Sequence, residues 1–314
     1  MAEHREEHKD KEKKQTWFKA RYLVLLLALC ATIYVGYIIY SQSMLIAKYS
    51  GPILDDNWWE ALNWIKNNTA ECAVVATYWD PGHFITAIAE RPVIYDGGTQ
   101  NAVALFTTDG KSTERSRMMD VATALYTSNE TKAIELLSWY KGNCSEMYFL
   151  ATSDLVGKSQ WWSYFSTWDP NKATGTKSNY YPLKLSQTRP SDDGSTNYVY
   201  SMGMNQAIII NERTVNNQTT LTPMYKEGTN FVKIKSMIAF SSQGLGSLQT
   251  YPDAELDALV WISPGGQNLI FIPPDLAKSM FTKMFFFNGQ GLTNFEFVKD
   301  WGGEVKLFKI KFND

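Results

Sequence analysis

Three consecutive side chains, Tyr78, Trp79 and Asp80, combine hydrogen-bond donors with a charged acceptor. Tyr78 carries a phenol hydroxyl, Trp79 an indole N–H that only donates, and Asp80 a carboxylate that accepts. Along an extended strand, Tyr78 and Asp80 point to one face and Trp79 to the other. A turn at Asp80-Pro81-Gly82 is therefore needed to bring the three groups together. Taken by itself, the sequence is also an ordinary strand end followed by a turn.

A second set of polar side chains recurs at helical spacing near the C-terminus. A Pro-Pro pair and a glycine-rich stretch predict a helix over residues 275–287. Asp275, Lys278 and Thr282 stand at i, i+3 and i+7 and so share one face of that helix. Asp275 lies at the N-terminus, where the helix dipole favours a negative charge. Alone, these charges are an ordinary first-turn pair on a solvated face.

Histidine offers few possibilities for catalysis. His4 and His8 lie in an N-terminal tail, so only His83 is available to the rest of the chain, which excludes a multi-histidine metal site. A hydrolase that uses Asp80 with His83 needs a nucleophile, and Thr86 is the only hydroxyl close to His83 in sequence. This is the least favoured of the functions considered. The net charge of −2 and the lack of a basic patch argue against nucleic acid as a partner.

Cys72 and Cys144 each stand just before a short apolar run, 73–79 and 147–152, that predicts a buried strand. If these strands are parallel neighbours, the two cysteines lie side by side, within the ~4–7 Å between Cα atoms that a disulfide needs. We therefore predict a Cys72–Cys144 disulfide.

Four Asn-x-Ser/Thr triplets are possible N-glycosylation sites. Such triplets arise often by chance, and they matter only if the domain lies outside the cytoplasm. A closed Cys72–Cys144 bridge would hinder glycosylation of the neighbouring triplet. The triplets begin at Asn67, Asn129, Asn143 and Asn217.

Residues 22–40 carry no charge and predict a transmembrane helix. At ~1.5 Å per residue they extend roughly 28 Å, close to a hydrocarbon core of about 30 Å. The run is longer than the ~7–15 apolar residues of a signal peptide, and no small-x-small cleavage site follows it. Seven Lys or Arg residues precede the span, whereas only Lys48 follows it before Lys66. This asymmetry predicts a cell-membrane protein with a cytoplasmic N-terminus and an extracytoplasmic C-terminal domain.

The elements after the span predict a mixed α/β fold. Short apolar runs at 72–79, 92–95 and 147–152 indicate buried strands, and predicted helices cover 84–90, pieces of 99–141, and 153–165. This order implies a mostly parallel sheet in the α/β core. The predicted organisation is a disordered tail (1–21), the transmembrane helix (22–40), a linker (41–54), an α/β core with the Tyr78–Asp80 motif (55–175), a β-rich insertion (176–262), and a return to the core (263–314) with strands at 295–299 and 305–312.

Two segments, 75–101 and 275–300, resemble the C-terminal globular domain of the oligosaccharyltransferase catalytic subunit of the archaeal AglB type. That family carries a Trp-Trp-Asp-Tyr-Gly signature followed by a DG-x-TQN stretch, and an Asp-x-x-Lys motif on a kinked helix before an FF-x-G-x-G-L segment. Here the signature reads Tyr78-Trp79-Asp80-Pro81-Gly82, so Tyr replaces the first Trp and Pro replaces the family's Tyr. Thr282 stands where the family usually has Met or Ile.

The resemblance implies that this chain recognises the acceptor sequon, Asn-x-Ser/Thr, for an N-glycosylation enzyme that transfers glycan from a lipid-linked oligosaccharide to asparagine. In the family, the signature residues grip the hydroxyl two residues after the asparagine. Asp80 is then expected to accept the hydroxyl proton, Trp79 to donate to its oxygen, and Tyr78 to replace the first Trp. Lys278 is expected beside the acceptor side chain, with Asp275 and Thr282 on the same helix face.

Family subunits precede this domain with a multi-span portion that holds the metal-binding acids, whereas this chain has one predicted span. We therefore expect no catalytic residue, metal ligand or cofactor in this chain, Mn or Mg in the complete enzyme, and no transfer by the chain alone. The expected partners are an acceptor polypeptide, membrane lipid, and a multi-span transferase portion in cis or in trans. The alternative is a membrane-anchored binding or interaction module with the same fold and no transferase role. A multi-span coding sequence upstream or nearby would favour the first interpretation.

Overall fold

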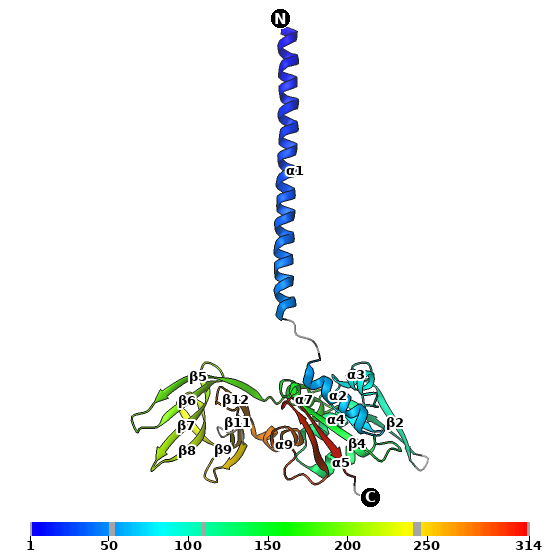
Figure 1. Ribbon diagram of the computed structural model, residues 1–314, viewed down its shortest axis with the longest axis vertical. Coiled ribbons are helices and arrows are strands. Elements are labelled where there is room, and N and C mark those ends of the chain that lie inside the picture. Colours follow the sequence, from blue (N-terminus) through cyan, green and yellow to red (C-terminus); the bar gives the residue numbers. More distant parts are fainter. Residues whose placement is uncertain (1, 50–53, 109–110, 241–245, 313–314) are drawn as a thin grey trace. The chain divides into compact units, whose positions relative to one another are not determined.

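The computed structural model describes residues 2–49, 54–108, 111–240 and 246–312. The chain forms two compact units, Met1–Asp55 and Asp56–Asp314, which are treated separately below (Figure 1).

The first unit contains one long helix, α1 (Ala2–Tyr49). Its segment Arg21–Lys48 contains an 18-residue window with a mean hydropathy of 2.3 and is long and apolar enough to cross a membrane. The helix also runs through residues 2–21, which were predicted to be disordered, because this stretch is rich in good helix formers such as Glu, Lys and Arg. The helix continues through residue 49 of the predicted linker, and residues 50–53 of that linker lie outside the described part of the chain.

The core of the second unit is a four-stranded sheet in the order β1-β4-β14-β13. Strand β1 (Val74–Ala76) pairs parallel with β4 (Met147–Thr152), and all residues of both strands are buried. Strand β14 (Val305–Ile310) is antiparallel to β4 and to β13 (Phe295–Trp301). The prediction of a mixed α/β fold is confirmed, but a mostly parallel sheet is wrong. A tight turn joins β13 to β14, and such a turn requires antiparallel neighbours.

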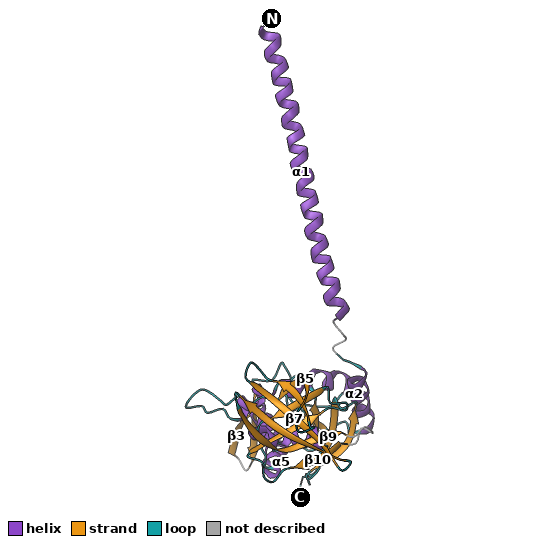
Figure 2. Ribbon diagram, turned by 90° about the vertical axis from the view of Figure 1, so that its left-hand side faces the viewer, coloured by secondary structure: helices purple, strands orange, loops and turns teal. Residues whose placement is uncertain are grey.

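Helices cover both faces of this sheet (Figures 1 and 2). On one face, α4, α5 and α9 share a buried apolar cluster with β1, β4 and β14, whereas α2 contacts β13 and β14. The helices of this unit are α2 (Asp56–Asn68), α3 (Gly82–Phe84), the π-helix η1 (Ile85–Ala89), α4 (Arg117–Tyr126), α5 (Glu130–Ser138), α6 (Asp154–Gly157), α7 (Ser159–Ser166), α8 (Pro274–Ala277) and α9 (Met280–Phe287).

Two local predictions within the core differ from the structure. The predicted strand 92–95 forms only a parallel bridge between Val93 and Val75. Part of the region predicted to be helical in pieces is instead an antiparallel hairpin of β2 (Val103–Thr108) and β3 (Lys111–Ser116). Strand β3 is polar and largely exposed, so it lacks the apolar alternation by which a strand is predicted.

The β-rich part of the second unit is an eight-stranded sheet in the order β10-β9-β11-β12-β5-β6-β7-β8, in which β8 also pairs with β9. This extra pairing closes seven of the strands into a barrel, and the pairs are antiparallel except β9 with β11. The strands are β5 (Tyr181–Pro190), β6 (Thr196–Ser201), β7 (Gln206–Val215), β8 (Gln218–Glu227), β9 (Asn230–Phe240), β10 (Gly246–Thr250), β11 (Leu256–Ile262) and β12 (Asn268–Ile272).

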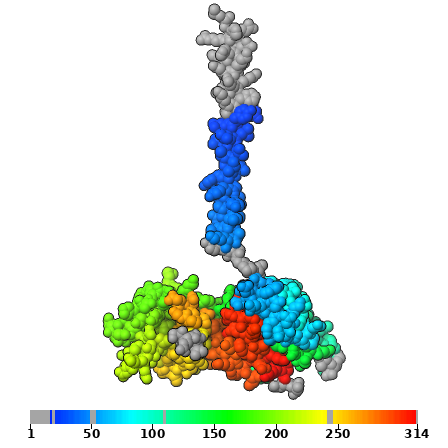
Figure 3. Space-filling view, viewed as in Figure 1, coloured from blue at the N-terminus to red at the C-terminus, as the bar shows by residue number. Residues whose placement is uncertain are grey.

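The barrel therefore extends ten residues beyond position 262, the predicted end of the β-rich insertion, because β12 pairs with both β11 and β5. After β12, the chain passes through α8 and α9 into β13 and β14. This C-terminal segment, orange to red in Figure 3, lies between the barrel and the N-terminal half of the core. Contacts between α8 and β11 join it to the barrel.

Candidate functional site

The Tyr78-Trp79-Asp80 triplet lies just beyond the carboxyl end of β1, where the chain turns into α3. The backbone N–H of Gly82 donates to the carbonyl of Trp79 at 3.3 Å, which closes the predicted turn. A Cβ atom at Gly82 would lie 2.7 Å from Cβ of Asp96 and 2.8 Å from the carbonyl oxygen of Tyr95. Glycine is therefore needed there, because the turn packs directly against the segment that contains the DG-x-TQN stretch.

Tyr78 is a buried support residue rather than a ligand-contacting one. Its side chain is 1% exposed, and its ring makes edge contacts with Trp79 and Tyr95, each with centroids 6.3 Å apart. Burial, together with the nearby charge of Asp80, raises the pKa of Tyr78 well above its ordinary value. The predicted direct contact of Tyr78 with an acceptor is thus not supported, because its hydroxyl is enclosed beside the Trp79 side chain and forms no well-aligned hydrogen bond within the described residues.

Asp80 presents one oxygen inward and leaves the other accessible. Its Oδ2 atom is buried and lies 2.8 Å from Nζ of Lys158, although the geometry of the contact is that of an ion pair without a well-aligned hydrogen bond. The side chain is 31% exposed, so Oδ1 carries its accessible polar surface. No hydrogen bond to Oδ1 is seen among the described residues. Asp80 can therefore accept a hydrogen bond from a ligand.

Lys158 lies between two carboxylates. Its Nζ atom is 2.7 Å from Oδ2 of Asp154 as well as 2.8 Å from Oδ2 of Asp80. Burial lowers the pKa of Lys158, but the contacts with Asp154 and Asp80 outweigh it, so that the pKa is raised. Lys158 therefore stays protonated and holds a compact negative-positive-negative cluster.

Sequence analysis did not identify Lys158, because it follows from topology rather than from a motif. Strands β1 and β4 are parallel neighbours, so their carboxyl ends meet at the same edge of the sheet. Residues after β1 thus meet residues after β4, which include Asp154 and Lys158. The sequence did carry a signal for Lys158. Asp154 and Lys158 stand at i and i+4 directly after a predicted buried strand.

Trp79 and His83 rest on the segment after residue 94. The Trp79 ring is half-buried, and its Cε3 and Cζ3 atoms lie 3.6 Å from the position of a Cβ atom built on Gly97. Asp96 accepts hydrogen bonds from Thr99 and Gly98 that lower its pKa, and Nδ1 of His83 lies 3.5 Å from its Oδ2. His83 thus faces Asp96 instead of Asp80.

No hydrolytic site is assembled at His83 in the described part of the chain. The hydroxyl of Thr86, the nucleophile that this function would require, donates to the backbone carbonyls of Gly82 and His83. It therefore does not pair with the His83 ring.

The predicted helix 275–287 is broken into α8 and α9 at Lys278 and Ser279. Ser279 adopts an extended conformation (ψ 155°), and its hydroxyl accepts from the backbone N–H of Thr282 at 3.1 Å. A serine that caps a helix competes with continuation of the preceding helix. The prediction that Asp275, Lys278 and Thr282 share one continuous helix face is therefore wrong.

These three side chains also lie in different surroundings. Asp275 accepts a short hydrogen bond from Ser178, and Lys278 is 63% exposed and pairs with Asp257 of β11. Thr282 is fully buried, donates to the carbonyl of Leu276 at 2.7 Å, and so cannot contact an acceptor. Within the described residues, no hydrogen bond or ion pair joins Lys278 to the Tyr78–Asp80 triplet.

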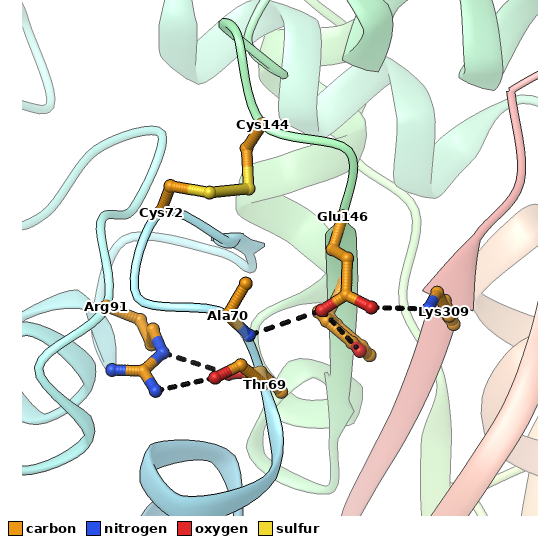
Figure 4. The surroundings of a disulfide bond; sticks show 8 residues. Thr69, Ala70, Cys72, Arg91, Cys144, Glu146 and Lys309 are labelled. Atoms are coloured by element: carbon orange, nitrogen blue, oxygen red, sulfur yellow. Dashed lines mark hydrogen bonds and ion pairs between the residues drawn. A yellow bond between two sulfur atoms is a disulfide. The ribbon is translucent and has the colours of Figure 1, made fainter.

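The opposite ends of β1 and β4 are joined covalently. The structure contains the predicted disulfide between Cys72 and Cys144, with 5.6 Å between their Cα atoms (Figure 4). Beside it, Glu146 accepts from the backbone N–H of Ala70 at 3.2 Å and from Nζ of Lys309 at 2.6 Å. The strand pair that carries Asp80 and Lys158 is thus fixed at its amino-terminal ends.

The four asparagines of the Asn-x-Ser/Thr triplets are exposed, but they differ in local structure. Asn67 lies in the last turn of α2, Asn129 caps α5, Asn143 precedes the disulfide-bonded Cys144, and Asn217 lies in the β7–β8 turn with φ of 61°. Within the described residues, no group of three or more His, Cys, Asp or Glu side chains is arranged to hold a metal ion.

Comparison with known proteins shows which proteins this chain is similar to. No model of a known protein family matches the chain. The dolichyl-phosphooligosaccharide-protein glycotransferase of Methanocaldococcus jannaschii is 22% identical over 375 residues, which cover 96% of this chain and 38% of the relative. The protein of the same name from Methanococcus voltae is 22% identical over 355 residues, covering 85% of this chain and 38% of the relative. The chain thus spans 38% of the length of these curated relatives.

Among solved structures, the archaeal oligosaccharyltransferase AglB from Archaeoglobus fulgidus, in complex with an inhibitory peptide and a dolichol-phosphate, aligns with a TM-score of 0.48 and 14% identity. The alignment covers 89% of this chain and 27% of that one. The resemblance to archaeal oligosaccharyltransferases that the two motifs predicted is confirmed by the relatives that cover most of this chain.

Proposed function

We propose that this chain, whose relatives are archaeal glycotransferases, reads the acceptor sequon Asn-x-Ser/Thr for an oligosaccharyltransferase. The observation that carries this proposal is the partly exposed carboxylate of Asp80, which directly follows the half-buried Trp79 in the turn after β1. In the proposed complex, the hydroxyl two residues after the asparagine donates to Asp80 and accepts from the Trp79 indole. A site built this way rejects a side chain without a hydroxyl, because its own polar groups are then unpaired.

The proposed partners follow from the same role. They are an acceptor polypeptide, membrane lipid around α1, and a multi-span transferase portion in cis or in trans. A Mn or Mg ion would belong to that portion and would neutralise the leaving phosphate.

The test compares peptides that differ only in the discriminating hydroxyl. The purified full-length chain in detergent is titrated with matched Asn-x-Thr and Asn-x-Val peptides, because Val has nearly the shape of Thr without its hydroxyl. We expect a preference for the Thr peptide of about 5- to 150-fold, which corresponds to about 1–3 kcal/mol for a hydroxyl bonded to a charged partner. Asp80→Ala should abolish this preference.

The matched control is Asp253→Ala, since Asp253 is an exposed aspartate on the barrel that pairs with Lys233. It should leave the preference intact. An Asp80→Ala chain that still prefers the Thr peptide would contradict the proposal. It would favour a membrane-anchored binding module without a role in glycosylation.

The proposed role also requires the second unit to lie outside the cytoplasm. The excess of Lys and Arg before the apolar segment of α1 favours a cytoplasmic N-terminus. Protease added to intact cells should therefore digest the region after residue 49 and spare an N-terminal epitope tag. Protection of that region until the cells are lysed would refute this orientation.

A further inference from the structure

Two lysines could serve the acceptor site, and their surroundings differ. The motif resemblance assigns this role to Lys278, which is 63% exposed and pairs with Asp257 on the barrel. Lys158 is 30% exposed, and its Nζ atom lies 2.8 Å from Oδ2 of Asp80. In this chain, the cation in contact with the signature aspartate is therefore Lys158.

The contact fixes the direction in which Asp80 points. Lys158 engages the buried Oδ2 atom, and the accessible surface of the carboxylate is then left to Oδ1. The lysine itself is held on its other side by Asp154 at 2.7 Å. A carboxylate bound at one oxygen by a fixed ammonium group loses little rotational freedom when its second oxygen accepts a ligand's proton.

The backbone around Lys158 limits where its ammonium group can lie. The residue stands between α6 and α7, as the C-cap of the first helix and the N-cap of the second. Its backbone N–H donates to the carbonyl of Asp154, and its carbonyl accepts from the N–H groups of Trp161 and Trp162. Helix α6 and then the α6–α7 junction follow β4, the parallel neighbour of β1, so Lys158 and Asp80 lie at one sheet edge after the same pair of strands.

We propose that Lys158 is a positioning residue of the acceptor site, which orients the Asp80 carboxylate for the acceptor hydroxyl. This inference rests on the proposed function in acceptor recognition. Removing the ammonium group leaves two carboxylates, Asp80 and Asp154, facing each other without a counter-ion. Their repulsion turns Asp80 away from the orientation that accepts the hydroxyl.

The experiment measures the ratio of affinities of the full-length chain for the Asn-x-Thr and Asn-x-Val peptides. Lys158→Met should lower the ratio at least about fivefold, through weaker Thr-peptide binding and nearly unchanged Val-peptide binding. Lys158→Arg, which keeps the positive charge, should keep most of the Thr-to-Val affinity ratio of the unmodified chain. The matched control is Lys233→Met, which removes an equally exposed lysine from its ion pair with Asp253 on the barrel and should leave the ratio unchanged. Lys278→Met tests the rival assignment.

A purely structural role of Lys158 would lower thermal stability and weaken both peptides alike, so an unchanged ratio in Lys158→Met overturns the proposal. If Lys158→Met does not fold, the double variant Lys158→Met/Asp154→Asn relieves the repulsion between the two carboxylates. Its ratio should still fall below that of the unmodified chain, because no ammonium group then holds Oδ2 of Asp80. If Lys278→Met loses the preference for the Thr peptide and Lys158→Met keeps it, the positioning role belongs to Lys278. Absence of any Thr preference in the unmodified chain would instead refute the proposed function itself.

Discussion

Tyr78 and Tyr95 show that the residues beneath the site are arranged for support. Both side chains are 1% exposed, and neither hydroxyl forms a well-aligned hydrogen bond within the described residues. A buried hydroxyl without a good partner destabilises the folded state, whereas the contacts of the Tyr78 ring with Trp79 and Tyr95 stabilise it. The ring of Tyr78 therefore matters more than its hydroxyl.

We predict that Tyr78→Phe leaves the free energy of unfolding unchanged or raises it by up to about 1 kcal/mol, because it removes only the unpaired hydroxyl. The preference for the Thr peptide should also be unchanged. Tyr78→Ala should cost about 3–5 kcal/mol, since it opens a cavity under Trp79. Urea unfolding and the peptide titration measure both effects.

Tyr95→Phe is the matched control for Tyr78→Phe, and it should behave in the same way. A Tyr78→Phe chain that folds normally but loses the Thr preference would show that the enclosed hydroxyl becomes exposed and takes part in binding.

Sequence alone identified some of these residues and missed others for physical reasons. The strand end and turn at Asp80 were predictable, because the polar triplet and Pro-Gly signal are local. Lys158 was missed because its role depends on the pairing of strands more than 70 positions apart in sequence. Thr282 was assigned to a surface from helical spacing, but the surrounding core encloses it completely.

At the level of elements, the site depends on how β1 and β4 are held together. Strand β1 has only three residues, so its own hydrogen bonds provide little stability. The amino-terminal ends of the two strands are joined by the Cys72–Cys144 disulfide and by the hydrogen bonds of Glu146 to Ala70 and Lys309 (Figure 4). These contacts set the register in which Asp80 and Lys158 meet at the other end.

We predict that Glu146→Gln lowers the free energy of unfolding by about 1–2 kcal/mol near pH 7, because it removes a charge-assisted bond to Lys309. Hydrogen bonding to Lys309, and to the backbone of Ala70, lowers the pKa of Glu146 below its ordinary value. The folded state thus binds the proton less tightly than the unfolded state. The stabilisation is therefore present above the ordinary Glu pKa of about 4.3 and is lost as the pH falls through the folded pKa.

Urea unfolding of both chains in steps from about pH 7 to pH 3 provides the measurement, since these values bracket the ordinary Glu pKa. The difference between the chains should shrink as the pH falls below about 4.3. A difference that stays constant across this range would mean that Glu146 acts through its shape and not through its charge.

The predictions for elements failed where distant residues decide the structure. The helix over 275–287 looked continuous, because capping by Ser279 becomes decisive only when the buried contacts of Thr282 hold α9 in place. A β-rich insertion was predicted, but closure of the barrel also depends on the pairing of β12 with β5, which is distant in sequence and which local alternation does not reveal.

For the whole molecule, the proposed function concerns recognition of the acceptor and not the transfer step. The chain spans 38% of the length of its curated relatives. Attack by an amide nitrogen on a lipid-linked sugar needs an activated nucleophile and a leaving phosphate whose charge is neutralised, usually by a divalent cation. In the proposed function, Asp80 and Trp79 would bind a hydroxyl and Lys158 would orient Asp80, and none of the three would supply either requirement.

We predict that the purified chain forms no glycopeptide from lipid-linked oligosaccharide, a sequon peptide and Mn or Mg. A chimera in which residues 56–314 replace the corresponding C-terminal region of a full-length archaeal relative should form glycopeptide. The multi-span portion would supply the chemistry, and this domain would supply the reading of the sequon. Mass spectrometry of the peptide products provides the measurement for both proteins.

The Asp80→Ala form of the chimera separates transfer from recognition. Its preference for Asn-x-Thr over Asn-x-Val should fall by about 5- to 150-fold, as expected for one charged hydrogen bond. The Asp253→Ala chimera should transfer normally, because that exposed barrel residue pairs only with Lys233 in the described structure. Glycopeptide formed by the isolated chain would overturn this division of roles, since the chain would then carry its own means of neutralising the leaving phosphate.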